Sequence, residues 1–286
     1  MISEAEVRRA AARLGVDPMV VDLDYVLGCF LASLYRQPLA AALRFKGGTC
    51  LRKCYYGNYR FSEDLDFTLT SGSSRADLEK MLGAVLAAAA DEWEIDFGVR
   101  PLRVDVVDDE YGNESFQARL YYRGPLRRSG DPRAIRLDIT TSEVLTFPAA
   151  ERGIIHLYSD AALLAGILVP CYDILEMLAE KIRALAGQRR YAISRDIYDI
   201  AQLTSRAGVD MARLAAAIPA KWRIKGLRES DFDPGRIAAR RGEFQADWER
   251  NLVHLLPSDG IMDFDSAWDR TCVFLKAANW PRGKIK

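Results

Sequence analysis

The feature that most constrains the fold is a short alternating segment in the first quarter of the chain. Polar and apolar residues alternate along it in the order Asp64, Leu65, Asp66, Phe67, Thr68 and Leu69. This period of two predicts a half-buried β-strand, because successive side chains of a strand point to opposite faces. The carboxylates of Asp64 and Asp66 would then project side by side from one face. Two carboxylates held this close favour a bound cation, and Mg²⁺ is an ion that carboxylates and substrate phosphates commonly share.

A pair of glycines and a small hydroxyl residue, Gly47, Gly48 and Thr49, precede this strand. Residues 41–45 lead into them as a strand or the end of a helix. Glycines let the backbone approach a ligand without interference from Cβ. A helix opened by Thr49 would aim its amides and hydroxyl group at an anion such as a triphosphate. A Gly-Gly-Thr turn or a lone Asp-x-Asp is weak alone, but the combination indicates a functional site.

The segments 46–49 (Lys-Gly-Gly-Thr) and 60–67 (Arg-Phe-Ser-Glu-Asp-Leu-Asp-Phe) together resemble the AbiEii-type nucleotidyltransferase toxins. These toxins are a branch of the DNA polymerase β-like nucleotidyltransferase superfamily. The superfamily pattern is Gly-Gly/Ser, a spacer, and Asp-x-Asp/Glu on the next strand. The spacer between Gly48 and Asp64 is long for the superfamily at large but fits this branch.

Downstream segments extend the resemblance over roughly residues 20–205. Residues 134–140 form another alternating segment, with Asp138 where the superfamily carries its third carboxylate. Residues 176–185 and 195–200 resemble the family's lysine-containing helix and its Arg-Asp-x-x-Asp helix. The last eighty residues match no motif of the family.

The resemblance implies metal-dependent phosphoryl transfer. Asp64 and Asp66 would hold Mg²⁺ on the nucleotide phosphates, and Asp138 would activate the attacking hydroxyl through a second metal or as a base. The catalytic and metal-binding residues implied are Asp64, Asp66 and Asp138. The nucleotide-binding residues implied are Lys46, Gly47, Gly48, Thr49, Ser62, Lys181, Arg195, Asp196 and Asp199.

Residue patterns alone leave several of these roles open. Lys181 flanks the apolar stripe of a helix expected over residues 173–186, so it either extends to the surface or reaches an anionic ligand. The resemblance favours the ligand. Arg195 and Asp199 also have the i, i+4 spacing of a helix-surface ion pair. Asp196 and Asp199 share a face, and either could orient Lys181 or the nucleotide.

Members of the resembled family act as toxins of toxin–antitoxin or phage-defence systems, and some modify the 3′ end of tRNA. The resemblance therefore implies transfer of a nucleoside monophosphate from an NTP to an RNA acceptor, with release of pyrophosphate. It also implies a cognate antitoxin protein. Two alternatives stay open: an acceptor that is a small molecule or a protein side chain, and a non-catalytic partner-binding protein that retains the fold. The presence of all three carboxylates disfavours the second.

Charge is unevenly distributed along a chain whose net charge is zero. Residues 60–118 contain 14 acidic and 5 basic residues, whereas residues 181–250 contain 15 basic and 9 acidic residues. A basic region suits a nucleic-acid acceptor, although a solvated helical surface would have the same composition. Trp222, between Lys221 and Arg223, could stack on a base or anchor its helix.

The cysteines and the apolar stretches predict a reduced, cytoplasmic protein without a membrane partner. Five cysteines at 29, 50, 54, 171 and 272 form no disulfide framework. Cys50 and Cys54 are one helical turn apart, but no second pair or nearby histidine completes a zinc site, so we expect reduced thiols in the core. The longest apolar stretches are shorter than the roughly 20 residues that span a bilayer, and the N-terminal segment reads as an amphipathic helix, not a signal peptide.

We expect an α+β fold: a mixed β-sheet with flanking helices, followed by a helical C-terminal lobe. Residues 1–170 would form the nucleotidyltransferase core with its N-terminal helices, and residues 171–286 a helical lobe that completes the nucleotide site. Helices are expected over residues 3–36, broken at Asp17-Pro18, and over 74–92. Further strands are expected over residues 95–107, 113–124 and 134–145. After Pro170 the pattern is helical, with breaks near Pro219, Pro234 and Pro257.

Overall fold

The computed structural model describes residues 1–108, 112–185, 191–228, 232–258 and 262–277. The chain divides into two compact units. The sheet unit comprises residues 1–142, 149–171 and 255–259, and the helical unit comprises residues 143–148, 172–254 and 260–286. None of the described helices combines the length and the apolar character needed to cross a membrane.

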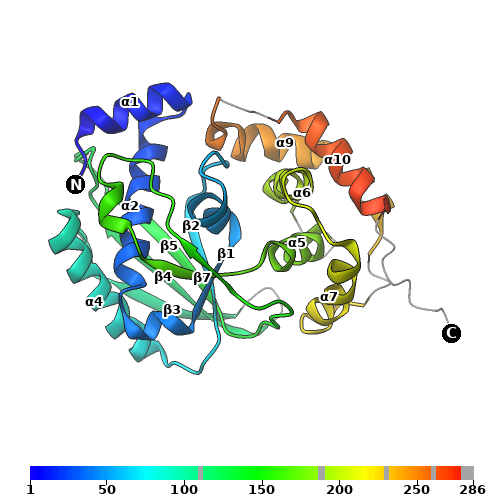
Figure 1. Cartoon of the computed structure of the whole chain (residues 1–286), viewed down its shortest axis with the longest axis horizontal. Coiled ribbons are helices and arrows are strands. Elements are labelled where there is room, and N and C mark those ends of the chain that lie inside the picture. Colours follow the sequence, from blue (N-terminus) through cyan, green and yellow to red (C-terminus); the bar gives the residue numbers. More distant parts are fainter. Residues whose placement is uncertain (109–111, 186–190, 229–231, 259–261, 278–286) are drawn as a thin grey trace. The chain divides into compact units, whose positions relative to one another are not determined.

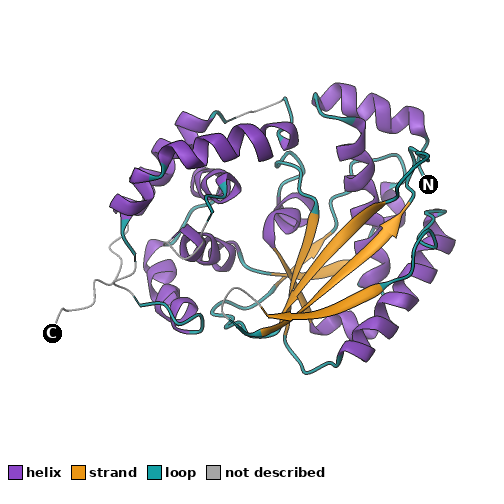
Figure 2. Cartoon of the chain, turned by 180° about the vertical axis from the view of Figure 1, so that it is seen from behind, coloured by secondary structure: helices purple, strands orange, loops and turns teal. Residues whose placement is uncertain are grey.

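Within the described residues, the sheet unit is built on a seven-stranded mixed β-sheet (Figure 2). Its strands are β1 (Leu43–Lys46), β2 (Asp64–Leu69), β3 (Arg103–Asp108), β4 (Glu114–Tyr122), β5 (Arg133–Thr140), β6 (Ala150–Gly153) and β7 (Leu168–Cys171). Across the sheet they follow the order β3-β4-β5-β2-β1-β7-β6. The pairs β2–β5 and β1–β7 are parallel, and the other neighbours are antiparallel. This mixed sheet with its helices confirms the predicted α+β class.

The three long helices of the sheet unit begin where the sequence places capping residues. They are α1 (Glu4–Leu14), α2 (Pro18–Leu34) and α4 (Arg75–Trp93). The side chains of Ser3 and Asp17 accept hydrogen bonds from the first turns of α1 and α2, and Ser74 forms a capping box with Asp77. Helices α2 and α4 lie side by side along one face of the sheet (Figure 1). The helices predicted in this region are therefore confirmed.

Several predicted strand limits are wrong. The strand expected from residue 95 begins at Arg103, after Pro101, which cannot donate a ladder hydrogen bond. The strand expected to reach residue 145 ends at Thr140. Strands β6 and β7 were not predicted, because β6 (Ala-Glu-Arg-Gly) has no alternating apolar residues and β7 (Leu-Val-Pro-Cys) contains a proline.

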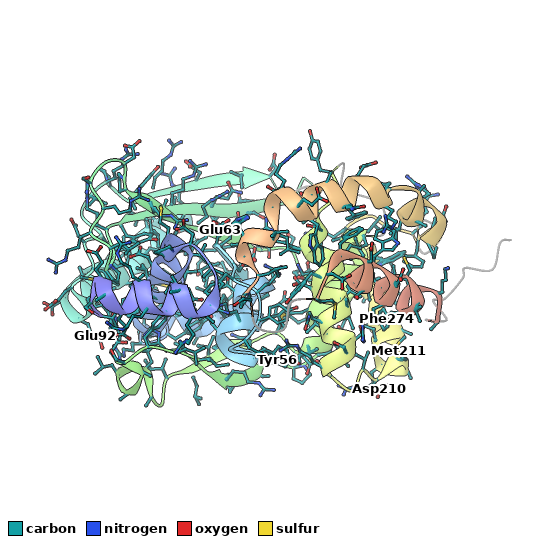
Figure 3. All side chains as sticks on the ribbon, turned by 90° about the horizontal axis from the view of Figure 1, so that it is seen from above. Tyr56, Glu63, Glu92, Asp210, Met211 and Phe274 are labelled. Atoms are coloured by element: carbon teal, nitrogen blue, oxygen red, sulfur yellow. The ribbon has the colours of Figure 1, made fainter. Side chains whose placement is uncertain are left out.

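The helical unit follows the predicted pattern with one exception. Its helices are α5 (Ile174–Arg183), α6 (Ser194–Arg206), α7 (Met211–Arg223), α8 (Pro234–Ala239), α9 (Arg241–Asn251) and α10 (Phe264–Ala277). Asp210 caps α7, which begins at Met211 (Figure 3). Pro219 lies inside α7, so the break expected there is wrong. Ile218 and Trp222, on either side of the proline, are both buried. Their packing offsets the helix hydrogen bond that the proline cannot donate.

Candidate active site

The three acidic residues singled out in the sequence lie on one face of the sheet. The parallel register of β2 and β5 sets Asp66 opposite Asp138 and Asp64 opposite Arg136. Paired residues of adjacent strands point to the same face, as do residues two apart along one strand. All three acids are partly exposed, whereas the alternate residues Leu65 and Leu137 are buried. We call Asp64, Asp66 and Asp138 the carboxylate face.

The chemistry of the carboxylate face fits a hard divalent cation. Carboxylate oxygens that are partly exposed to solvent are the ligands that Mg²⁺ prefers. Among the described residues, however, no three carboxylate groups bring oxygens within 4.8 Å of one another. The Nε atom of Arg136 lies 3.4 Å from Oδ1 of Asp64. This arginine, which the sequence did not single out, therefore adds a positive charge beside the first acid.

The first glycine of the turn is required by the position of Asp66. Gly47 has a φ of +78°, a left-handed conformation that side chains other than glycine disfavour. A Cβ at this position would lie 2.1 Å from Oδ2 of Asp66. The absence of a side chain at Gly47 thus leaves room for the Asp66 carboxylate. The sequence had suggested only that it would leave room for a ligand.

The second glycine accommodates a buried arginine. A Cβ on Gly48 would lie 2.4 Å from Nη2 of Arg60. Arg60 is 2% exposed, and its Nη1 donates a hydrogen bond to the backbone oxygen of Phe61 at 3.2 Å. Arg60 belongs to the sequence motif of residues 60–67, but the motif alone predicts no role for it. Its burial against the glycine turn is a tertiary contact that local pattern does not encode.

Thr49 fixes the turn to the neighbouring strand. Its buried hydroxyl donates a hydrogen bond to the backbone oxygen of Asp64. Helix α3 (Gly47–Cys50) begins two residues earlier than predicted and continues as the π-helical segment η2 (Leu51–Tyr55). The bond ties the start of α3 to the start of β2.

Two further predicted residues of the sheet unit lie next to this turn in the chain. Lys46 ends β1, is buried, and pairs in register with Asp66 across the antiparallel β1–β2 ladder. Ser62 is buried two residues before β2 begins. Both therefore lie within two residues of an element of the candidate site.

In the helical unit, Lys181 on α5 is held by two acids of α6. Its Nζ lies 2.7 Å from Oδ1 of Asp196 and 3.0 Å from Oδ2 of Asp199. Both acids are buried. Lys181 therefore does not simply extend to the surface, and Asp199 is not half of a helix-surface ion pair with Arg195. Arg195 itself is partly exposed near the start of α6. The shared face of Asp196 and Asp199 was predicted correctly, and both of them orient Lys181.

Part of the predicted basic region is internal. The Nζ of Lys221 lies 2.5 Å from Glu176 and 3.2 Å from each of Glu143 and Glu180. Arg183 pairs with Glu143 at 2.9 Å. We call Glu143, Glu176, Glu180, Arg183 and Lys221 the ion cluster.

The neighbouring tryptophan of that region is also internal. Trp222 is 2% exposed, and its ring lies 5.9 Å from that of Phe232. It therefore anchors α7 and cannot stack on a nucleic-acid base in this conformation. Together with the burial of Lys221, this weakens the expectation of a basic surface around residues 221–223.

Comparison with known proteins agrees with this architecture. The sequence model of the family described as nucleotidyl transferase AbiEii toxin, of type IV toxin–antitoxin systems, matches residues 29–270. The matched region contains all the predicted site residues. No curated protein sequence gives a significant match.

Solved structures of other proteins share the fold. MenT4, a nucleotidyltransferase toxin from Mycobacterium tuberculosis, aligns with a TM-score of 0.53 at 23% identity, covering 97% of this chain and 98% of MenT4. JHP933 from Helicobacter pylori aligns with a TM-score of 0.53 at 18% identity, covering 91% of this chain and 92% of JHP933. At these identities the likeness concerns the fold alone.

Proposed function

Because the chain belongs to the AbiEii family of nucleotidyltransferase toxins, we propose that it transfers a nucleoside monophosphate from an NTP to an RNA acceptor. The acceptor we propose is the 3′ end of a tRNA, and the released product is pyrophosphate. One observation carries this proposal: Asp138 lies directly beside Asp66 in the β2–β5 register, with Asp64 two residues away on the same face.

We assign the steps of the reaction to the carboxylate face. Asp64 and Asp66 would hold Mg²⁺, which when bound neutralises phosphate charge and favours in-line displacement. Asp138 would accept the proton of the acceptor hydroxyl. The hydroxyl oxygen then forms a bond to the α-phosphorus, and the bond from that phosphorus to the bridging oxygen breaks. Pyrophosphate leaves with the bridging oxygen, so atoms and charges balance.

The glycine turn would keep these carboxylates in place. Gly47 leaves room for the Asp66 carboxylate, and Thr49 holds the backbone at Asp64. Such positioning is most of what a protein contributes to phosphoryl transfer. We propose that the remaining predicted residues take part in nucleotide binding: Lys46, Gly48, Ser62, Lys181, Arg195, Asp196 and Asp199.

We further propose that a cognate antitoxin opposes this activity, and that the enzyme acts in the cytoplasm. The family is defined by toxins of type IV toxin–antitoxin systems. Induced expression of the chain alone should slow bacterial growth. The Asp66→Asn variant should not slow it if nucleotidyl transfer is the toxic activity.

The decisive experiment measures label transfer. Purified protein is incubated with Mg²⁺, total RNA and each α-labelled NTP in turn, with and without EDTA. We expect label in RNA with wild type and none with Asp66→Asn or EDTA. Asp91→Asn, an exposed acid on α4, is the matched control and should behave as wild type.

Digestion of the labelled product identifies the acceptor. Label released by RNase supports the RNA proposal, whereas label released only by protease or found in small molecules contradicts it. Equal labelling by wild type and Asp66→Asn would overturn the assignment of the carboxylate face.

A further inference from the structure

Three of the five cysteines come together in the sheet unit. Cys50 ends α3, Cys54 lies in η2 and Cys171 ends β7. Their Sγ atoms all lie within 4.8 Å of one another, the three residues are at most 5% exposed, and none forms a disulfide. The i, i+4 spacing of Cys50 and Cys54 was visible in the sequence. Cys171 joins them because β7 pairs in parallel with β1, with Cys171 in register with Phe45.

We propose that Cys50, Cys54 and Cys171 bind one soft, thiophilic metal ion, with Cu(I) favoured over Zn(II). Thiolate sulfur selects such ions over Mg²⁺, so this site is chemically distinct from the carboxylate face. With metal–sulfur bonds of about 2.3 Å, three ligands around one ion stand roughly 4 Å apart, which the observed spacing accommodates with small side-chain movements.

The number of ligands decides between the two ions. Structural Zn²⁺ is almost always bound by four ligands. Among the described residues, the cluster of potential metal ligands around these sulfurs contains no histidine, aspartate or glutamate. Burial of the three thiols also leaves little access for a water molecule as a fourth ligand. Three thiolates suit a trigonal Cu(I) ion and leave Zn²⁺ one ligand short.

Positive charges lie near the cluster. Those of Lys53, which precedes Cys54 in the chain, and of Arg152 both act on Cys54. The guanidinium of Arg152 on the edge strand β6 also lies 4.6 Å from the ring of Tyr55, next to Cys54 in the chain. These positive charges would offset the negative charge of a metal–thiolate centre.

The position of the cluster indicates how a bound ion would affect the structure. Cys50 ends the short helix that begins at Gly47, the residue whose lack of a Cβ leaves room for the Asp66 carboxylate. An ion bound by Cys50 and Cys171 would therefore fix the glycine turn to β7. The site does not depend on the proposed nucleotidyl transfer, and it can be tested without nucleotide.

Competitive titration tests the proposal. Reduced, full-length protein is titrated anaerobically with Cu(I) against a colorimetric Cu(I) chelator, and separately with Zn(II). We expect one Cu(I) per chain, bound more tightly than Zn(II), and a rise in Tm on Cu(I) addition. Serine substitution of any cluster cysteine should weaken Cu(I) binding by at least ~100-fold, because even outer-shell changes cost 10–100-fold.

Matched controls make the result decisive. Cys29→Ser, a buried thiol outside the cluster, and Cys272→Ser should bind Cu(I) as wild type does. Asp66→Asn should also bind it unchanged, which separates this proposal from the catalytic one. If a serine variant fails to fold by circular dichroism, the alanine variant replaces it. Cluster variants that bind Cu(I) like Cys29→Ser, or tighter binding of Zn(II) than of Cu(I), would overturn the proposal.

Discussion

The carboxylate face and the ion cluster both gather three acids, but in opposite environments. The acids of the carboxylate face are partly exposed on adjacent strands. In the ion cluster, the side chains of Glu143, Glu176 and Lys221 are at most 1% exposed, and both glutamates contact Lys221 directly. Buried charges need their partners, so removing one leaves the others uncompensated. Partly exposed like charges can be removed without that penalty, which suits groups kept for chemistry.

The protonation of Lys221 illustrates the difference. Burial alone would lower the pKa of this lysine, but the nearby charges of Glu180, Glu143 and Glu176 raise it above its usual value. The folded state therefore holds Lys221 as a cation throughout the physiological range. The ion cluster is a permanent structural element of the helical unit, and the carboxylate face is a set of groups open to a cation and to substrate.

The largest effect is expected at Asp138, where a substitution should lower activity without lowering stability. Asp138→Asn keeps the shape of the side chain but removes the proposed proton acceptor. We expect nucleotidyl transfer to fall on the order of 10⁴-fold, about 5.5 kcal/mol in barrier height. Urea unfolding should show a free energy of unfolding equal to or slightly above that of wild type. A loss of stability parallel to the loss of rate would break the comparison, because it would make the carboxylate face structural.

The ion cluster should show the reverse behaviour. Lys221→Met removes the cation that contacts the buried side chains of Glu143 and Glu176 and the partly exposed Glu180, and we expect a loss of about 3–5 kcal/mol in the free energy of unfolding. Urea denaturation followed by tryptophan fluorescence measures this loss. Lys276→Met, an exposed lysine on α10, should change stability by less than about 0.5 kcal/mol.

A charge-balanced double variant sharpens this test. Adding Glu176→Gln to Lys221→Met removes one uncompensated charge, so the double variant should be more stable than Lys221→Met alone. A loss of under about 1 kcal/mol for Lys221→Met would contradict a structural role for the cluster.

Local patterns predicted the elements that depend on local chemistry. The alternation of residues 64–69 gave β2, and the capping residues Asp17 and Ser74 marked the starts of α2 and α4. Strand β7 was missed because Pro170 masks it, and α7 continued past Pro219 because tertiary burial outweighs a missing hydrogen bond. These misses are positions at which packing overrides local preference.

The candidate site divides in the same way. Asp64 and Asp66 lie on the same face because side chains alternate along one strand. Asp138 was predicted as the third carboxylate from the order of the family's motifs. The contact of Arg60 with Gly48, however, arises only when the chain folds back on itself. The same holds for Cys171, which reaches Cys50 through the β1–β7 pairing, 121 residues after Cys50 in the chain. No local pattern reports such contacts.

A smaller effect on rate is expected at the turn that supports Asp66. Gly47→Ala combines an unfavourable φ with a Cβ that would displace the Asp66 carboxylate. We expect transfer to fall on the order of 100-fold, as small misplacements of catalytic groups do, with a loss of stability of about 1–2 kcal/mol. Gly112→Ala is a matched control, because its φ is +79° but its Cβ would meet nothing within 4 Å. It should lose stability without losing activity, and equal rates for the two variants would contradict a positioning role for Gly47.

The smallest expected effect concerns the protonation of a buried polar group inside the sheet unit. His156 is buried, and its Nε2 lies 3.0 Å from Oδ1 of Asp160. Burial lowers the pKa of His156 below its usual 6.5 despite the opposing charges of Asp160 and Asp24, and the charge of Lys53 acts in the same direction as burial. The unfolded chain therefore takes up the proton first, so stability is full above about pH 6.5 and falls as pH drops through that value.

Between pH 7.5 and 5.5 we accordingly expect wild type to lose up to about 1 kcal/mol more than His156→Gln, since one pKa unit corresponds to 1.36 kcal/mol. Urea unfolding at both pH values measures the difference. His254→Gln, which removes an exposed histidine, should keep the wild-type pH dependence. Asp24 and Asp160 have lowered pKa values and stay ionised in this window, so they add no slope of their own. If His156→Gln loses stability with falling pH as steeply as wild type does, burial does not hold His156 neutral. Exposure alone would then not identify which polar groups of this protein are structural.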